Sequence, residues 1–190
     1  MLLAASITGA LLAGGLSLHE ETSTAFRLFR DVCLASDGDR SRIIDAAGEN
    51  GFAIQVGVRP RAFGRLTNAV MLPWTGDEMK TALFIGWRGP LLSCVITSRR
   101  GDQPDFTEDV ESWTGFEADP ARVSGSVTNY FFTQTERGRE SIGDATPEQQ
   151  SAFLADGSFR VLWTSRTDEA VTLSFTAPPK GDAPTSTASE

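Results

Sequence analysis

The segment 81–98 constrains the fold more than any other part of the chain. Its sequence, TALFIGWRGPLLSCVITS, holds two apolar runs of strand length that are separated by the turn-forming residues Arg88-Gly89-Pro90. Runs that are rich in β-branched and aromatic residues on both sides of a turn are typical of paired strands. Neither run alternates between apolar and polar residues, so we expect other elements to cover both faces of the pair.

Periodic patterns elsewhere add helices and further strands. Apolar residues recur at helical spacing in 22–35 and 40–48, and the motif Thr146-Pro147-Glu148-Gln149 predicts a capped helix that ends near Gly157. Further strands are expected at 52–58, 68–74, 127–135, 158–165 and 170–176. We therefore predict an α+β fold, with N-terminal helices packed on a largely antiparallel β-sheet of about six or seven strands.

Length and composition predict one domain. The chain has 190 residues, is 40% hydrophobic and contains 12 Phe and 4 Trp, enough for one ordinary core. We assign this domain to residues 16–177. Residues 178–190 are mainly Pro, Ser, Thr and Ala without an apolar pattern, so we expect a disordered tail.

The first fifteen residues predict export. Residues 1–15 carry no charge and end in Ala13-Gly14-Gly15, which resembles the apolar core and cleavage site of a signal peptide. The run is too short to span a bilayer as a stable helix, so we expect no integral membrane span after its removal and a periplasmic or secreted location. No Lys or Arg precedes it, so either translation starts upstream or the signal is weak. The alternative is a buried N-terminal helix.

The expected state of the two cysteines depends on whether the protein is exported. Cys33 lies on the apolar face of the first predicted helix and Cys94 in the second apolar run. In an oxidising compartment a bridge between them would contribute about 4 kcal/mol, whereas two buried thiols are the alternative in the cytosol.

A family resemblance points the same way. The run Phe29-x-x-x-Cys33-Leu34, followed by Ala46-Ala47, Gly51-Phe52 and a second Cys in a later strand, resembles small exported bacterial proteins of uncharacterised function. The resemblance implies export and a paired cysteine, and it implies no catalytic or binding residue.

Charge and arginine placement suggest one type of ligand. The formal net charge of −8 disfavours nucleic acid as a partner. The loop that carries Arg59, Arg61 and Arg65 is the most basic segment, and three guanidinium groups there could hold an anion. Alternatively, these side chains face water or acidic neighbours.

A cluster of acidic residues offers the other candidate site. Asp105, Glu108, Asp109 and Glu111 lie at the start of a predicted helix, where Asp105 and Glu108 have the spacing of a capping box. Two such carboxyls facing one cleft could act as acid and base on a glycan. The helix dipole and solvation explain the same residues without catalysis.

Catalytic and metal-binding motifs are absent from the sequence. There is a single histidine, His19, and neither a zinc-binding nor a nucleotide-binding motif occurs, so we expect no metal and no cofactor. The leading hypothesis is an exported, non-enzymatic module that binds a protein or cell-envelope ligand. The alternatives are a carboxylate-based hydrolase that acts on cell-wall or glycan substrates, and a purely structural role.

Overall fold

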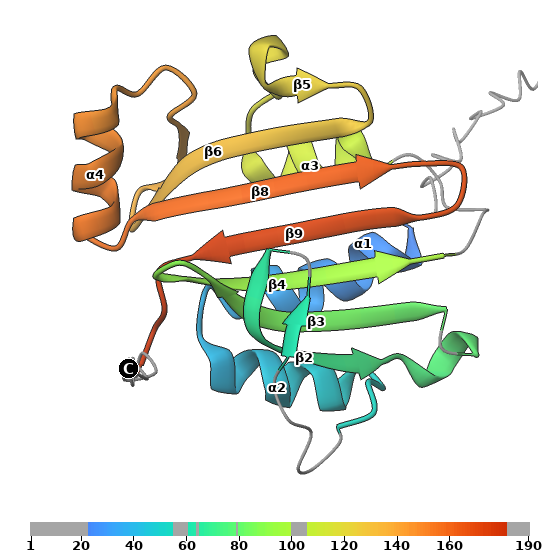
Figure 1. The fold of residues 1–190 in the computed structure, drawn as a ribbon. Helices are drawn as coiled ribbons and strands as arrows, with labels where there is room; N and C mark the ends of the chain where they lie inside the picture. The colour runs from blue at the N-terminus through green and yellow to red at the C-terminus, as the bar shows by residue number, and fades with distance from the viewer. Residues whose placement is uncertain (1–22, 55–60, 64, 79, 100–105, 182–190) are drawn as a thin grey trace, which may run out of the picture.

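A single antiparallel sheet forms the centre of the protein (Figure 1). The computed structural model describes residues 23–54, 61–63, 65–78, 80–99 and 106–181. Within these residues nine strands join in the order β1-β2-β3-β4-β9-β8-β6-β5, and β7 also pairs with β6. Every pair of strands is antiparallel. The predicted α+β fold is confirmed.

The strands come in two blocks along the chain. The first block consists of β1 (Arg61–Phe63), β2 (Leu66–Pro73), β3 (Thr81–Arg88) and β4 (Leu91–Ser98). The second consists of β5 (Val123–Ser124), β6 (Val127–Thr135), β7 (Gly138–Ser141), β8 (Phe159–Arg166) and β9 (Val171–Ala177). The last strand, β9, lies between β4 and β8 and so joins the two blocks into one sheet.

Helices cover one face of this sheet. These helices are α1 (Thr24–Phe29), its π-helical continuation η1 (Arg30–Leu34), α2 (Arg40–Glu49) and α3 (Thr107–Thr114). Helix α4 (Pro147–Ala155) lies beside the sheet at the ends of β6 and β8 and has no buried residue, and two short 3-10 turns, η2 (Thr75–Asp77) and η3 (Pro120–Arg122), lie in connecting segments. In Figure 1, α1 and α3 lie behind the sheet. The Ser23 hydroxyl caps α1 by accepting a hydrogen bond from the Phe26 N–H at 3.0 Å.

The strand register divides the side chains into two faces. One row across the sheet, here called the core face, meets the helices; it contains Ile85, Cys94, Phe175, Leu162 and Tyr130. All five side chains are buried in one cluster with α1, η1 and α2. Burying an aliphatic or aromatic side chain of this size contributes about 1.5–3 kcal/mol, so this layer stabilises the fold substantially.

The opposite face, here called the open face, is covered only in part. Its adjacent row contains Phe84, Val95, Ser174, Trp163 and Asn129. In Figure 1, β1 and the beginning of β2 cross in front of β3 and β4. Leu66 and Ala69 of β2 are buried there against Phe84 and Val95 in a second, smaller core. Both faces of the β3–β4 pair are therefore covered, as its sequence predicts.

Two backbone features allow β2 to fold over the sheet. The pairing of β2 with β3 shifts register between Thr67 and Val70, where Asn68 has a positive φ of 49°. Gly86 lies beneath the crossing, and a Cβ added there would be only 3.0 Å from the Ala69 Cβ. Glycine at this position lets the two strands approach closely without displacing Ala69.

The disulfide joins the helical layer to the sheet. Cys33 of η1 and Cys94 of β4 are bonded, with an S–S distance of 1.99 Å and a Cα–Cα distance of 5.5 Å. Both residues are almost fully buried, with exposed fractions of 0% and 1%. The predicted Cys33–Cys94 pairing is confirmed.

The expected elements agree with the structure at most positions. Six of the seven predicted strands correspond to β2, β3, β4, β6, β8 and β9, while β1, β5 and β7 were not expected. Of the strand expected at 52–58, Phe52 forms an isolated bridge to Trp74, and positions 55–58 lie outside the described residues. The cap of α4 is confirmed, because Thr146 and Gln149 form a reciprocal capping box.

The start of α3 differs from the expected capping box. Phe106 is the N-cap residue of α3, and within the described residues its position has no side-chain cap hydrogen bond. Phe106 is buried in the core, with an exposed fraction of 4%, so apolar packing positions the helix start. Asp105, the predicted cap, lies outside the described residues.

An ion-pair cluster holds the first residues after β9. Arg160 donates two hydrogen bonds to the Asp37 carboxylate, at 2.6 and 3.1 Å, and Lys180 Nζ binds the same carboxylate. The Lys180 N–H also donates to the Gly38 carbonyl at 2.9 Å. Residues 178–181 of the predicted tail are thus ordered, and 182–190 lie outside the described residues.

The length of the helices bears on the prediction that the protein has no integral membrane span. Among the described residues, no helix has the length and apolar character needed to cross a bilayer. The proposed signal segment 1–15 and His19 belong to residues 1–22, which the structure does not describe.

Candidate functional site

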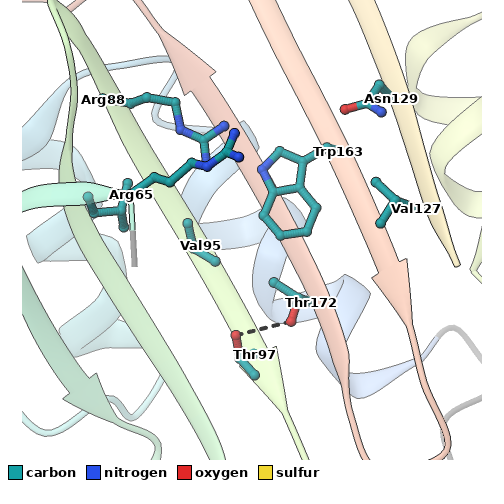
Figure 2. A pocket seen from close by; sticks show the side chains of 9 residues that line it. Arg65, Arg88, Val95, Thr97, Val127, Asn129, Trp163 and Thr172 are labelled. Carbon is teal, nitrogen blue, oxygen red and sulfur yellow. Dashed lines mark hydrogen bonds between the residues drawn. The ribbon is translucent and has the colours of Figure 1, made fainter. Parts of the chain in front are cut away.

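A groove of about 710 Å³ lies on the open face, beside the part of β2 that crosses the sheet. Strands β2, β3, β4, β9, β8 and β6 contribute to it, because their register places one row of side chains on this face. Its lining consists of Arg65, Leu66, Arg88, Val95, Thr97, Val127, Asn129, Trp163 and Thr172. Figure 2 shows these side chains from close by.

Two arginines meet at one end of this groove. Thr67 of β2 pairs with Trp87 of β3, so the residues just beyond this pair, Arg65 and Arg88, lie next to each other. In Figure 2 both guanidinium groups extend toward the nitrogen side of the Trp163 indole. We call this group, formed by Arg65, Arg88 and the Trp163 N–H, the arginine end of the groove.

The arginine end contains hydrogen-bond donors without acceptors. Arg88 Nε and Trp163 Nε1 are buried and have no hydrogen-bond partner among the described residues. Within the same residues, no carboxylate forms a salt bridge with Arg65 or Arg88. A buried donor that remains unpaired costs about 1–3 kcal/mol, so an acceptor supplied by a ligand would be favourable here.

The two positive charges also affect each other. Burial lowers the pKa of the Arg88 guanidinium below its ordinary value, and the nearby charge of Arg65 lowers this pKa further. Both effects on the Arg88 pKa reflect a cation that lacks the counter-charge it would have in a salt bridge. An anion placed between the two groups would remove the repulsion and supply the missing acceptor.

The surrounding sequence explains why no acidic residue neutralises the arginines. The chain has 25 acidic residues, yet β3, β4, β6, β8 and β9 contain no Asp or Glu. The segment 55–64, which precedes Arg65, contains two arginines and no acid. A positive groove in a protein of net charge −8 is therefore a local feature of this face.

Polar side chains farther along the groove each make one hydrogen bond within the protein. The hydroxyls of Thr97 and Thr172 bond to each other at 3.3 Å, and Asn129 Nδ2 donates to the Arg122 carbonyl at 3.2 Å. Val95 and Val127 supply apolar surface on either side of Trp163. The groove thus combines a charged end with an uncharged body of apolar side chains, two hydroxyls and one amide.

The structure brings only part of the predicted arginine loop to this site. Arg65 lines the groove. Arg61 lies in β1 and pairs with Ala69, but its side chain lies outside the described part of the structure, as does Arg59. The anion site predicted for Arg59, Arg61 and Arg65 stays a prediction, to which the structure adds two residues that were not expected, Arg88 and Trp163.

A sequence signal for these two residues existed in part. Arg88 is a charged residue at the end of an apolar strand, and Trp163 is a large aromatic residue in a strand that contains no Asp or Glu. Each residue could therefore have been noted as a candidate from the sequence. Their convergence depends on the pairing of β8 with β9 and of β9 with β4, which periodicity does not encode.

Three of the four predicted carboxylates lie in the described structure, and the fourth, Asp105, lies outside it. Glu108 is exposed on α3, and Glu111 accepts a hydrogen bond from the Ala118 N–H at 3.4 Å. Asp109 is half-buried on the same helix, near Arg30. None of these three residues lines the groove or the second cavity described next.

A second cavity of about 420 Å³ lies between α4 and the segment after β7. Asp119, which lines it, accepts a hydrogen bond from the Ala121 N–H at 2.9 Å and lies 3.9 Å from Arg122 Nε. Its carboxylate is thus engaged within the protein. No group of three or more His, Cys, Asp or Glu side chains in the described residues is arranged to hold a metal ion.

Comparisons with known proteins supply no functional assignment. No family model, no curated protein and no solved structure matches this chain. Functional inference therefore rests on the geometry of the groove.

Proposed function

We propose that this protein is an exported, non-enzymatic binding module of the cell envelope or periplasm, and that it binds an anionic ligand in the groove on the open face. The observation that carries the proposal is the arginine end, where the buried Arg88 Nε and Trp163 Nε1 lack acceptors among the described residues and the exposed Arg65 adds a second guanidinium group. Guanidinium groups bind carboxylate and phosphate oxygens through two parallel hydrogen bonds, which suits this pair.

Two further features support export. Residues 1–15 have the composition of a signal peptide. The buried Cys33–Cys94 disulfide is of the kind that persists in oxidising compartments. If export occurs, N-terminal sequencing of the protein purified from its native cells will find a mature start near Leu16. Recovery of the intact Met1 start would contradict export and leave the binding proposal untouched.

Anion binding can be followed at the groove itself. The indole N–H resonance of Trp163, assigned with a Trp163→Phe variant, reports on the arginine end. We expect it to shift when the protein is titrated with inorganic phosphate, acetate or benzoate, and to stay in place with the neutral acetamide and benzamide.

Charge variants provide the matched control. Arg88→Gln removes one guanidinium from the groove and is expected to abolish the anion-dependent shift. Arg40→Gln removes the same charge from the exposed start of α2, away from the groove, and is expected to leave the shift intact. Failure of all three anions to move the resonance, or their unchanged effect in Arg88→Gln, would overturn the proposal.

A further inference from the structure

The two parts of the groove differ in the chemistry that they can recognise. At the arginine end, Arg65, Arg88 and Trp163 Nε1 present donors only. Farther along β4 the lining changes to Val95 and Thr97, and the hydroxyl of Thr97 is already paired with Thr172. A ligand that fits both parts has an anionic head and a body that needs few hydrogen bonds.

Size argues against a bare inorganic ion as the complete ligand. The groove has a volume of about 710 Å³. Cavities of about 300–1,000 Å³ hold organic molecules in most small-molecule sites. An isolated phosphate or acetate at the arginine end would leave the rest of the groove, including the indole, in contact with water.

The orientation of Trp163 indicates the shape of the body. In Figure 2 the indole is seen face-on beside Val95 and Thr172, with its nitrogen side toward the two guanidinium groups and its six-membered ring farther along the groove. The residue is half-buried, so part of its ring is accessible. A flat ring stacked on an indole gains about 0.5–1.5 kcal/mol beyond the burial of its area.

The charge of the groove lining also restricts the body of the ligand. Apart from Arg65 and Arg88, every residue that lines the groove is uncharged. A second charge on the ligand would therefore be desolvated without a partner, which is unfavourable. Beyond the arginine end only Thr97, Thr172 and Asn129 line the groove with polar side chains, and each already makes one hydrogen bond within the protein, so few groups remain for the many hydroxyls of a sugar.

We infer that the ligand is an aromatic acid, a flat uncharged ring that carries one carboxylate or phosphate group, with its anionic oxygens between Arg65 and Arg88 and its ring over the indole of Trp163. This inference rests on the proposed function, because it assigns the class of ligand that the same groove binds. Carboxylate and phosphate share the required chemistry, and separate probes distinguish them.

The test compares probes that differ only in the ring or the charge. Dissociation constants are measured for benzoate, phenyl phosphate, acetate, inorganic phosphate and benzamide with the full chain. We expect benzoate or phenyl phosphate to bind about tenfold or more tightly than its ringless counterpart, which corresponds to about 1.4 kcal/mol. Benzamide is expected to show no binding, and whichever aryl probe binds more tightly identifies the head group.

Variants of Trp163 separate stacking from hydrogen bonding. Trp163→Phe keeps a ring face and is expected to retain the preference for aryl over ringless anions. Trp163→Leu removes the ring face. The ratio of the dissociation constants of ringless and aryl anions is then expected to fall toward one, while the ringless anions still bind. Thermal unfolding of each variant confirms that it is folded, and the wild-type probe ratios test the inference even if a variant is not.

The outcomes distinguish the two proposals. If ringless and aryl anions bind wild type equally well, or if Trp163→Leu keeps the full aryl preference, the aromatic-acid inference fails while anion binding stands. If none of the anionic probes binds, both fail.

Discussion

Arg65 and Arg88 lie side by side at one end of the groove, and no carboxylate among the described residues forms a salt bridge with either of them. Pairing of Thr67 with Trp87 creates this proximity, since it aligns the start of β2 with the end of β3. Like charges held together without a counter-ion do not stabilise the empty protein. Their placement is explained by a ligand more readily than by folding.

The first prediction concerns the stability of the arginine variant. Arg88→Gln should leave the free energy of unfolding of the ligand-free protein within about 0.5 kcal/mol of wild type, or raise it, because it removes a repulsive pair. Chemical denaturation without added anion measures this. A loss of several kcal/mol would show that Arg88 serves the fold, which would remove the main support for the groove as a binding site.

The second prediction concerns the disulfide. Replacing both Cys33 and Cys94 with Ala should lower the free energy of unfolding by about 4 kcal/mol, because the bridge closes a loop of 61 residues in the unfolded chain. Both sulfurs are buried, so a reductant should leave the bridge intact under native conditions and cleave it once denaturant is added. Thiol titration checks this, and rapid reduction of the native protein would contradict the observed burial.

The third prediction concerns acid stability. Burial raises the pKa of Asp37, but the hydrogen bonds from Arg160 and Lys180 outweigh it, so the net pKa lies below its ordinary value. The Asp37 carboxylate therefore stabilises the fold above its unfolded pKa of about 3.9, and this contribution is lost as the pH falls through the lower folded value. In denaturation experiments from pH 7 to pH 2, the midpoint should decline as the pH falls below about 3.9.

Asp37→Asn provides the matched variant for the acid-stability prediction. Asn accepts the positive φ of 44° at this position, so the change removes the charge while keeping the backbone. At pH 7 the loss should be about 3 kcal/mol, because the buried Arg160 loses its ion-pair partner. The pH dependence should also be shallower than that of wild type. An identical pH profile in wild type and variant would mean that other carboxylates cause the acid loss.

The fourth prediction concerns Gly86 and the crossing of β2. A Cβ at Gly86 would approach the Ala69 Cβ to 3.0 Å and the Leu66 Cβ to 3.1 Å. Gly86→Ala should therefore cost about 1–3 kcal/mol and displace Arg65, which directly precedes Leu66, so anion binding should weaken too. Adding Ala69→Gly moves the methyl group from one strand to the other and should restore part of both properties. No recovery in the double variant would locate the strain elsewhere.

The fifth prediction compares two buried serines on the open face. Ser174 Oγ is buried and has no hydrogen-bond partner in the described structure, whereas Ser93 Oγ bonds to Thr176 Oγ1 at 2.8 Å. Ser174→Ala should be neutral or stabilising in denaturation experiments. Ser93→Ala should cost about 1 kcal/mol, because it leaves the Thr176 hydroxyl unpaired. Equal losses in the two variants would indicate a partner for Ser174 that the structure does not contain.

Local patterns in the sequence determined a large part of this fold. Apolar runs on both sides of Arg88-Gly89-Pro90 predict the β3–β4 hairpin and its covered faces, and the alternation in 170–176 predicts β9. The Thr146 and Gln149 capping box predicts the start of α4. These elements follow from interactions between residues that are close in sequence, which periodicity and cap chemistry report directly.

Only the tertiary structure decided which distant segments meet. The pairing of Leu92 with Ala177 inserts β9 beside β4, and the register shift near Asn68 turns β2 over the open face. Strand order and crossing depend on how well whole faces pack, and many orders satisfy the same alternation of apolar and polar residues. Arg65, Arg88 and Trp163 come together through this global packing. Local sequence patterns therefore could not predict the groove, although they could place each of these residues in or beside a strand.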